Sequence, residues 1–275
     1  MGPMTWHDGW RSRRVRHPRI GRWMLVAALA AAGTAAQAAD LQVNPIMVEF
    51  ATGEHSQAIW LTNTGTEPLK AQVRVSSWSQ ADGTDRLTPT RDLIASPAIL
   101  EVAAGEQQLV RLIRPRTEAS QSELAYRLAI DELPADAAAP RDPGLQFLLQ
   151  YSVPVFVLAE GTEPLSPSRR TATTPEAAGA PAGLSASLAS QGDASLLSIA
   201  NPGRQRVRLS NLAWVDGTGK RTELVPGLFG YVLAGQRMQW EIPLSPQLRA
   251  GGGSLKVRFN DDPNDQTLPL ETPGS

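Results

Sequence analysis

Between residues 41 and 158 the chain alternates short runs of apolar and polar side chains, and turn-forming residues separate these runs. Alternation places the apolar side chains on one face of an extended strand, and Gly, Pro, Asn and Asp favour the turns between strands. No stretch keeps the period of a helix. The runs predict strands at 58–61, 73–78, 99–102, 109–113, 126–130 and 145–157, of which the last is the longest.

A second β region follows a segment that has almost no large apolar side chains. Residues 160–183 are rich in Pro, Ala, Thr and Ser, which is typical of a linker or loop. We therefore predict an all-β chain with two antiparallel β-sandwich domains, at 39–159 and 184–275, joined through 160–183. Weaker alternation in the second domain predicts strands at 196–199, 207–212, 231–233, 240–242 and 255–259.

The first 38 residues have the composition of a targeting segment. Six arginines precede an apolar run at 23–31, and the small-residue sequence Ala36-Gln37-Ala38 follows it. The run is far shorter than the roughly 20 residues that span a bilayer, so a membrane anchor is the weaker alternative. We predict a signal peptide at 1–38, cleaved after Ala38, and no membrane insertion after cleavage. Arg13 and Arg14 leave twin-arginine export open as a second route.

Removal of this leader makes the chain acidic. The leader holds six of the 26 basic residues and one of the 27 acidic residues, so 20 basic and 26 acidic residues remain. The remaining basic residues are scattered, which argues against a nucleic-acid-binding surface. The chain has no cysteine, so each sandwich must be held by its apolar core without a disulfide.

Few residues suited to catalysis are present. His55 is the only histidine outside the leader, and it lies in a turn-like segment. The lack of cysteine excludes cysteine nucleophiles and Cys/His zinc sites, and no Gly-x-Ser-x-Gly segment supplies a serine nucleophile. The adjacent acids Asp131 and Glu132 point to opposite faces of a strand, so they cannot flank one glycosidic bond. We predict no enzyme activity, no metal site and no cofactor.

Six segments carry a family resemblance through their order and spacing: 41–45, 61–68, 108–115, 123–134, 151–157 and 231–235. They resemble the PapD-like periplasmic chaperones of chaperone-usher pili, and in particular their archaic branch. The resemblance implies two immunoglobulin-like sandwiches in an L or boomerang arrangement. It also implies a periplasmic protein that stabilises pilus or spore-coat-like subunits and delivers them to an outer-membrane usher.

The resemblance further implies that the chaperone lends a β-strand to a subunit that lacks its own last strand. Leu145, Phe147 and Leu149 alternate along the predicted strand 145–157 and follow a Pro- and Ala-rich segment. This apolar row has no obvious partner within the chain, so we predict that it is the donor strand. The alternative is that the row packs in the chaperone's own core.

The family holds the terminal carboxylate of the subunit with two basic residues, one on the first strand and one on the donor strand. Met47 stands at the first position, and no basic residue lies between Gln146 and Val157. Arg127 is the first candidate for a carboxylate anchor and Arg74 the second, because their apolar neighbours are expected to face the core. Both arginines are alternatively ordinary solvated strand residues.

The family also joins its two domains through an arginine that meets two acids. Glu123 matches one of these acids, and Asp261 is predicted to be the second. Leu158 stands where the family has the arginine, so Arg111 or Arg258 is expected to replace it. Both acids are alternatively plain surface charges.

Another exported two-domain sandwich, such as an adhesin or a structural fibre component, is the main alternative function. A fibre subunit would need an alternating apolar arm before its first strand. The residues between the predicted cleavage site and Pro45 are too few for such an arm.

We expect replacement of His55 by Ala to leave the protein folded and able to deliver subunits, because a turn histidine without a catalytic partner is solvated. Circular dichroism would report folding, and the amount of subunit assembled on the cell surface would report delivery. A folded variant that no longer delivers subunits would contradict the exclusion of histidine chemistry.

Overall fold

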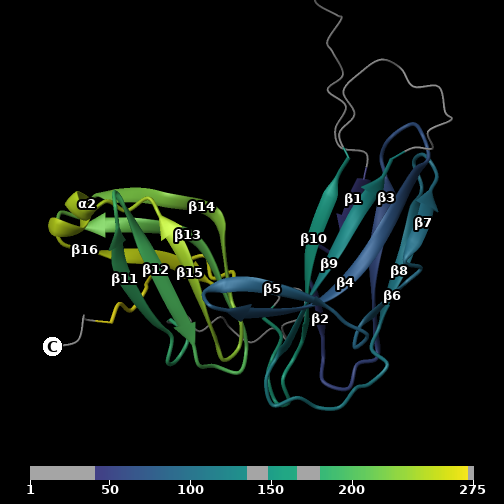
Figure 1. Cartoon of the computed structure of the whole chain (residues 1–275), viewed down its shortest axis with the longest axis horizontal. Coiled ribbons are helices and arrows are strands. Elements are labelled where there is room, and N and C mark those ends of the chain that lie inside the picture. The colour runs from purple at the N-terminus through teal and green to yellow at the C-terminus, as the bar shows by residue number, and fades with distance from the viewer. Residues whose placement is uncertain (1–40, 135–147, 166–179, 272–275) are drawn as a thin grey trace, which may run out of the picture. The chain divides into compact units, whose positions relative to one another are not determined.

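The computed structural model describes residues 41–134, 148–165 and 180–271 (Figure 1). The predicted signal peptide at 1–38 lies outside these residues. The strands of the first half are β1 (Leu41–Asn44), β2 (Val48–Phe50), β3 (Ser56–Asn63), β4 (Leu69–Ala81), β5 (Thr84–Pro89), β6 (Ile94–Ser96), β7 (Ile99–Val102), β8 (Gln107–Ile113), β9 (Leu124–Leu133) and β10 (Gln150–Val157). Those of the second half are β11 (Ser185–Gln191), β12 (Ala194–Asn201), β13 (Val207–Asp216), β14 (Arg221–Val232), β15 (Gln236–Ile242), β16 (Gly253–Phe259) and β17 (Gln266–Thr267).

Two sheets form the first sandwich. One has the strand order β1-β3-β8-β6, and the other has the order β2-β10-β9-β4-β5, with β7 beside β4. All pairs are antiparallel except β2 with β10. The inward side chains of both sheets form one buried cluster, which includes Ile59, Leu61, Val110, Leu112, Val73, Leu128, Ile130 and Val155.

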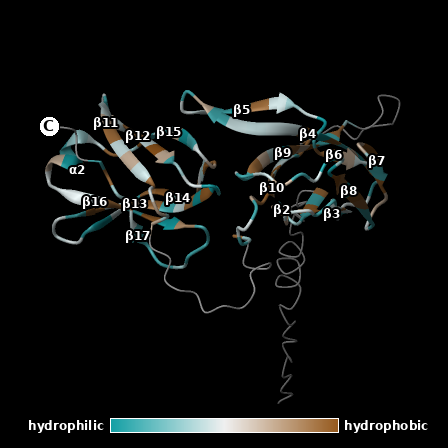
Figure 2. Ribbon diagram, turned by 90° about the horizontal axis from the view of Figure 1, so that it is seen from below, coloured by the Kyte–Doolittle hydropathy of each residue, from teal (hydrophilic) through white to brown (hydrophobic). Residues whose placement is uncertain are grey.

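The second sandwich pairs the sheet β11-β12-β15 with the sheet β14-β13-β16-β17 and has a buried cluster of its own. Apolar residues alternate with polar ones along many of the strands in Figure 2. The prediction of an all-β chain with two β-sandwiches is confirmed. Within the described residues, α2 (Pro246–Ala250) is the single helix, and no helix there is long and apolar enough to cross a bilayer.

Strand β14 is much longer than the predicted strand 231–233. Pro226 and Gly227 lie in its middle, and both residue types weaken the sequence signal of a strand. The register against β13 shifts around Asn211, which has φ of 54° and accepts a hydrogen bond of 2.9 Å from the Gly227 N–H through its side chain. This bulge lets the strand continue through the irregular residues.

The strand predicted at 145–157 begins later than expected. Residues 145–147 lie outside the described part, Leu148 and Leu149 are not in a strand, and β10 starts at Gln150. The Glu132 carboxylate accepts a hydrogen bond of 3.2 Å from the Leu149 N–H, so a side chain takes the place of a backbone acceptor there. With 13 residues, β4 is longer than β10, which has eight.

Strands β4 and β5 form a hairpin that reaches the second sandwich. Asp82 and Gly83 make its turn with φ of 53° and 74°, as a tight hairpin turn requires. The Gly83 carbonyl accepts a hydrogen bond of 3.0 Å from the Gln239 N–H of β15. A Cβ on Gly83 would lie 2.7 Å from the Gln239 side chain, so only glycine fits this contact without displacing its neighbour.

Candidate functional site

Arg127 projects from the outer face of the sheet β2-β10-β9-β4-β5, the face turned away from the first core. Its neighbours on β9, Tyr126 and Leu128, are buried in that core, and alternate residues of a strand point to opposite faces. In the ladder, Arg127 lies opposite Pro154 of β10 and Ser76 of β4. The candidate anchor therefore lies next to β10, on the non-core side that the sequence predicts.

Arg74 lies on the same outer face, in a polar group at the start of β10. Its Nε and Nη2 donate hydrogen bonds of 2.9 and 2.7 Å to one oxygen of Asp131, and Gln150 donates to the other oxygen. Burial pushes the pKa of Asp131 up, but the hydrogen bonds from Gln150 and Arg74 hold that pKa below its usual range. The charge of Arg74 is therefore already matched, which makes it the weaker candidate for a carboxylate anchor.

Arg127 has no such acid. In the described part of the chain its guanidinium makes no hydrogen bond or ion pair, and it stacks 3.8 Å from the centre of the Trp78 ring. The Tyr231 ring lies 5.8 Å away on β14 of the second sandwich. Burial lowers the pKa of Arg127, and the nearby Asp85 and Tyr231 offset part of this effect. A half-buried cation on aromatic rings, which makes no ion pair with any described acid, can receive an external carboxylate.

The Trp78 ring is held by both sandwiches. Its Nε1 donates a hydrogen bond of 2.9 Å to Asp85, and the ring meets Phe156 and Tyr231 with centroids 5.9 and 5.6 Å apart. These three aromatic residues form a small buried cluster with Leu233. The outer face thus passes from a polar end at Asp131 to an aromatic end at the second sandwich.

One edge of β10 is open over part of its length. Residues 150–157 pair with β9, but β2 covers only Val155, Phe156 and Val157 on the other edge. Within the described residues, no strand pairs with that edge between Gln150 and Pro154. The backbone groups that the described strands leave unpaired on this edge can pair with another strand.

Of the predicted donor row, Leu145 and Phe147 lie outside the described residues. Leu149 is half-buried and packs against the first core. Its neighbour Leu148 has 45% of its surface exposed. The donor role of the three residues stays a prediction.

A buried arginine from the second sandwich meets two acids of the first. Arg206 Nη1 lies 2.6 Å from Glu123, its Nη2 contacts Glu49, and its backbone N–H donates to Glu123 at 3.0 Å. All three side chains are at most 2% exposed, and the guanidinium carbon lies 3.7 Å from the centre of the Phe156 ring. Burial raises the pKa of Glu123, and the contacts with Arg206 offset part of that rise.

This group revises the expected link between the domains. Glu123 takes part in it, but the arginine is Arg206 instead of Arg111 or Arg258. The second acid is Glu49, whereas Asp261 pairs with Arg208 on the surface. One signal in the sequence could have found Glu49, because a charged residue between Val48 and Phe50 in a wholly buried strand needs a partner.

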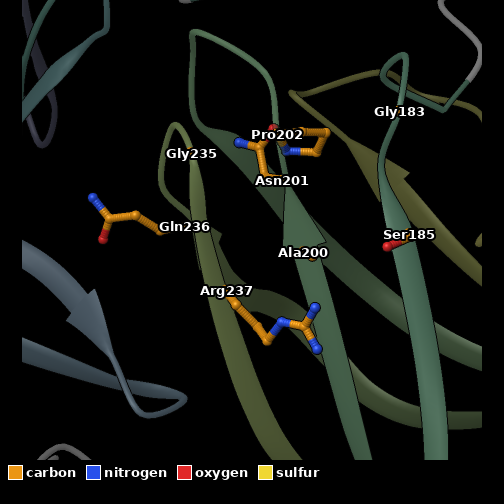
Figure 3. A pocket seen from close by; sticks show the side chains of 8 residues that line it. All are labelled: Gly183, Ser185, Ala200, Asn201, Pro202, Gly235, Gln236 and Arg237. Atoms are coloured by element: carbon orange, nitrogen blue, oxygen red, sulfur yellow. The ribbon is translucent and has the colours of Figure 1, made fainter.

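A shallow pocket of about 310 Å³ lies on the second sandwich. Figure 3 shows Gln236 pointing away from Ser185, and its side-chain oxygen accepts a hydrogen bond from the Gln80 N–H. Among the described residues that line the pocket, Arg237 alone is charged, and no acid lies with it. Within the described residues, no three His, Asp or Glu side chains are grouped to hold a metal ion.

Comparison with known proteins gives a consistent result. Residues 40–162 match the family described as "Pili and flagellar-assembly chaperone, PapD N-terminal domain". A chain of the CsuC-CsuE chaperone-tip adhesion subunit pre-assembly complex, from archaic chaperone-usher Csu pili of Acinetobacter baumannii, is 25% identical. It has a TM-score of 0.64, with 85% of this chain and 100% of that chain covered.

Two further structures show the same fold at lower identity. The YadV chaperone is 20% identical, with a TM-score of 0.54 and coverage of 83% of this chain and 98% of its own. A chain of the Salmonella enterica SafA pilin-SafB chaperone complex is 14% identical, with a TM-score of 0.53 and coverage of 86% and 99%. No curated protein matches by sequence.

We expect Arg206→Ala to lower the free energy of unfolding by about 3–5 kcal/mol, because it leaves two buried carboxylates without a counter-charge. Urea denaturation at neutral pH would measure the loss. Arg208→Ala is the matched control, since it removes a partly exposed ion pair two residues away and should cost less than about 1 kcal/mol. Equal losses in the two variants would show that the buried group does not stabilise the fold in this way.

Proposed function

We propose that the chain, whose residues 40–162 match the family of PapD-like pilus-assembly chaperones, is a periplasmic chaperone of the archaic chaperone-usher type. It binds pilus or spore-coat-like subunits by donor-strand complementation and delivers them to an outer-membrane usher. The family is one of chaperones and not of enzymes. The likeness to a chain of a chaperone-tip adhesion subunit complex supports subunits as partners.

The open edge of β10 between Gln150 and Pro154 is the observation that carries this proposal. A subunit that lacks its last strand exposes unpaired backbone groups and an apolar groove, and both cause aggregation. A strand that pairs along the open edge satisfies the backbone groups, while alternate apolar side chains fill the groove. The other edge of β10 is paired with β9, which is paired in turn with β4.

The row Leu145, Phe147 and Leu149 supplies the apolar side chains in this proposal. Burial of Leu145 and Phe147 contributes roughly 3–6 kcal/mol before the costs of association and ordering. Leu149 already packs against the chaperone's own core, so it joins the row to the folded sheet. Leu145 and Phe147 then provide most of the new contact.

Arg127 supplies the charge in this proposal. A carboxylate that enters beside Pro154 meets a guanidinium for which the described residues offer no acid. The Trp78 ring covers one face of the guanidinium and leaves its N–H donors free to form paired hydrogen bonds. This single arginine replaces the two basic residues of the family pattern. Met47 stands at the first of those two positions.

Replacing Leu145, Phe147 and Leu149 together with Ser or Asn should leave the chaperone folded and unable to protect its subunit. The measurement is the amount of soluble subunit in the periplasm of cells that produce each variant. A double variant at Leu145 and Phe147 should lose protection too, and it keeps the contact of Leu149 with the core.

Ile99→Asn is the matched control for this experiment, because it removes an apolar side chain that is 61% exposed on β7, away from β10. The control should protect the subunit as well as the wild type does. Wild-type levels of soluble subunit with the double and the triple variant would rule out the donor strand.

Arg127→Ala should weaken subunit binding by about 2–5 kcal/mol, the range for removing one partner of a buried charge pair. Its effect on folding should be small, because Arg127 makes no ion pair with the described residues. Arg74→Ala is the control and should cost less than about 1 kcal/mol, since Arg74 already pairs with Asp131 at the surface. Equal binding of a subunit with a free C-terminus and of one with an amidated C-terminus would show that no carboxylate is captured.

A further inference from the structure

The guanidinium of Arg127 is positioned by an aromatic ring, because the described residues give it no hydrogen-bond acceptor. A ring that orients a cation must itself be fixed. Trp78 is 3% exposed, and its Nε1 donates a hydrogen bond of 2.9 Å to Oδ1 of Asp85 across the β4–β5 hairpin. The hydrogen bond to Asp85 therefore fixes the rotation of the Trp78 ring about its side-chain bonds.

The same oxygen of Asp85 has a second donor. Gln80 Nε2 donates to it at 3.0 Å and also to the Tyr231 carbonyl at 2.8 Å. Gln80 Oε1 accepts a hydrogen bond of 2.9 Å from the Leu233 N–H. Asp85 thus fixes Trp78 on one side and the contact between the hairpin and β14 on the other.

Every residue of β5 is exposed, so Asp85 needs no buried counter-charge, and its hydrogen bonds come from side chains of β4. A direct ion pair does not explain the acid at position 85, because no Asp85 oxygen lies within 4.0 Å of an Arg127 nitrogen. The Asp85 carboxylate instead accepts hydrogen bonds from Trp78 and Gln80.

We propose that Asp85 is a positioning residue for carboxylate capture: through Trp78 it holds the Arg127 guanidinium in place on the outer face of the sheet, and Tyr231 of the second sandwich completes the site. This inference rests on the proposed function. It assigns no contact between Asp85 and the carboxylate. The anchor then exists in full only when the hairpin is docked on β14, so that both sandwiches contribute to it.

Two variants separate the hydrogen bond of Asp85 from its charge. Asp85→Asn keeps an oxygen that accepts from both Trp78 and Gln80, and it removes the negative charge. Asp85→Ala removes the acceptor as well. A hydrogen bond contributes about 0.5–1.5 kcal/mol, which corresponds to a change of about twofold to thirteenfold in affinity.

The probe is N-acetylalanine, which carries a free carboxylate, with N-acetylalanine amide as its uncharged match. Each is titrated into the isotope-labelled mature chain, and the NMR signals of Trp78 Nε1–H and Arg127 Nε–H are followed. We expect the acid to shift both signals with saturation and the amide to leave them in place. Asp85→Ala should raise the Kd for the acid at least about threefold, while Asp85→Asn should stay within about twofold of the wild type.

Two results would overturn the inference while the anchor stands: an unchanged Kd in folded Asp85→Ala, or equal losses in the Ala and Asn variants. Failure of the acid to bind the wild-type protein would overturn both the anchor and the inference. Chaperone activity itself is decided separately, by the variants at Leu145 and Phe147, so failure here does not count against it.

Discussion

The ion pairs of Arg206 with Glu49 and Glu123 are the interaction on which the joining of the two sandwiches depends. Each ion loses its water at a cost of several kcal/mol, so the group is stable only when every charge has partners. The two acids come from the first sandwich and the arginine from the second. The Leu165 N–H also donates to Glu49 at 3.1 Å, so the chain that leaves β10 takes part as well. Separation of the sandwiches would leave two acids without their cation.

A second attachment between the sandwiches consists of uncharged groups. Both attachments contact the same residue of β10, Phe156. The hairpin turn at Gly83 and the amide of Gln80 bond to backbone groups of β15 and β14. Phe156 lies between the attachments, with Trp78 on one side and Arg206 on the other. The strand proposed to bind subunits therefore ends inside the junction. Substitutions at the junction are therefore expected to alter the position of β10.

The pattern of apolar and polar residues predicts those features of the fold that depend on strand alternation. The two sandwiches and the outward placement of Arg127 both follow from period-two spacing. The pattern could not find Arg206 as the partner of Glu123, because the two residues are 83 positions apart and meet only after both sandwiches form. Resemblance led instead to Asp261, which pairs with Arg208 at the surface. The length of β14 was missed because its bulge is set by Asn211 on the neighbouring strand.

The open edge of β10 also limits which strand can bind there. The Leu149 carbonyl points to β9 and the Leu158 N–H points to Phe50, so even-numbered residues of β10 turn their backbone groups to the open edge. Gln150 and Ser152 each offer an N–H and a carbonyl, whereas Pro154 offers a carbonyl alone. A strand that pairs with this edge therefore finds no N–H donor at Pro154. Arg127 lies opposite Pro154 on the neighbouring strand β9. A chain that ends there in a carboxylate needs no further backbone donor, because the guanidinium supplies the missing hydrogen bonds.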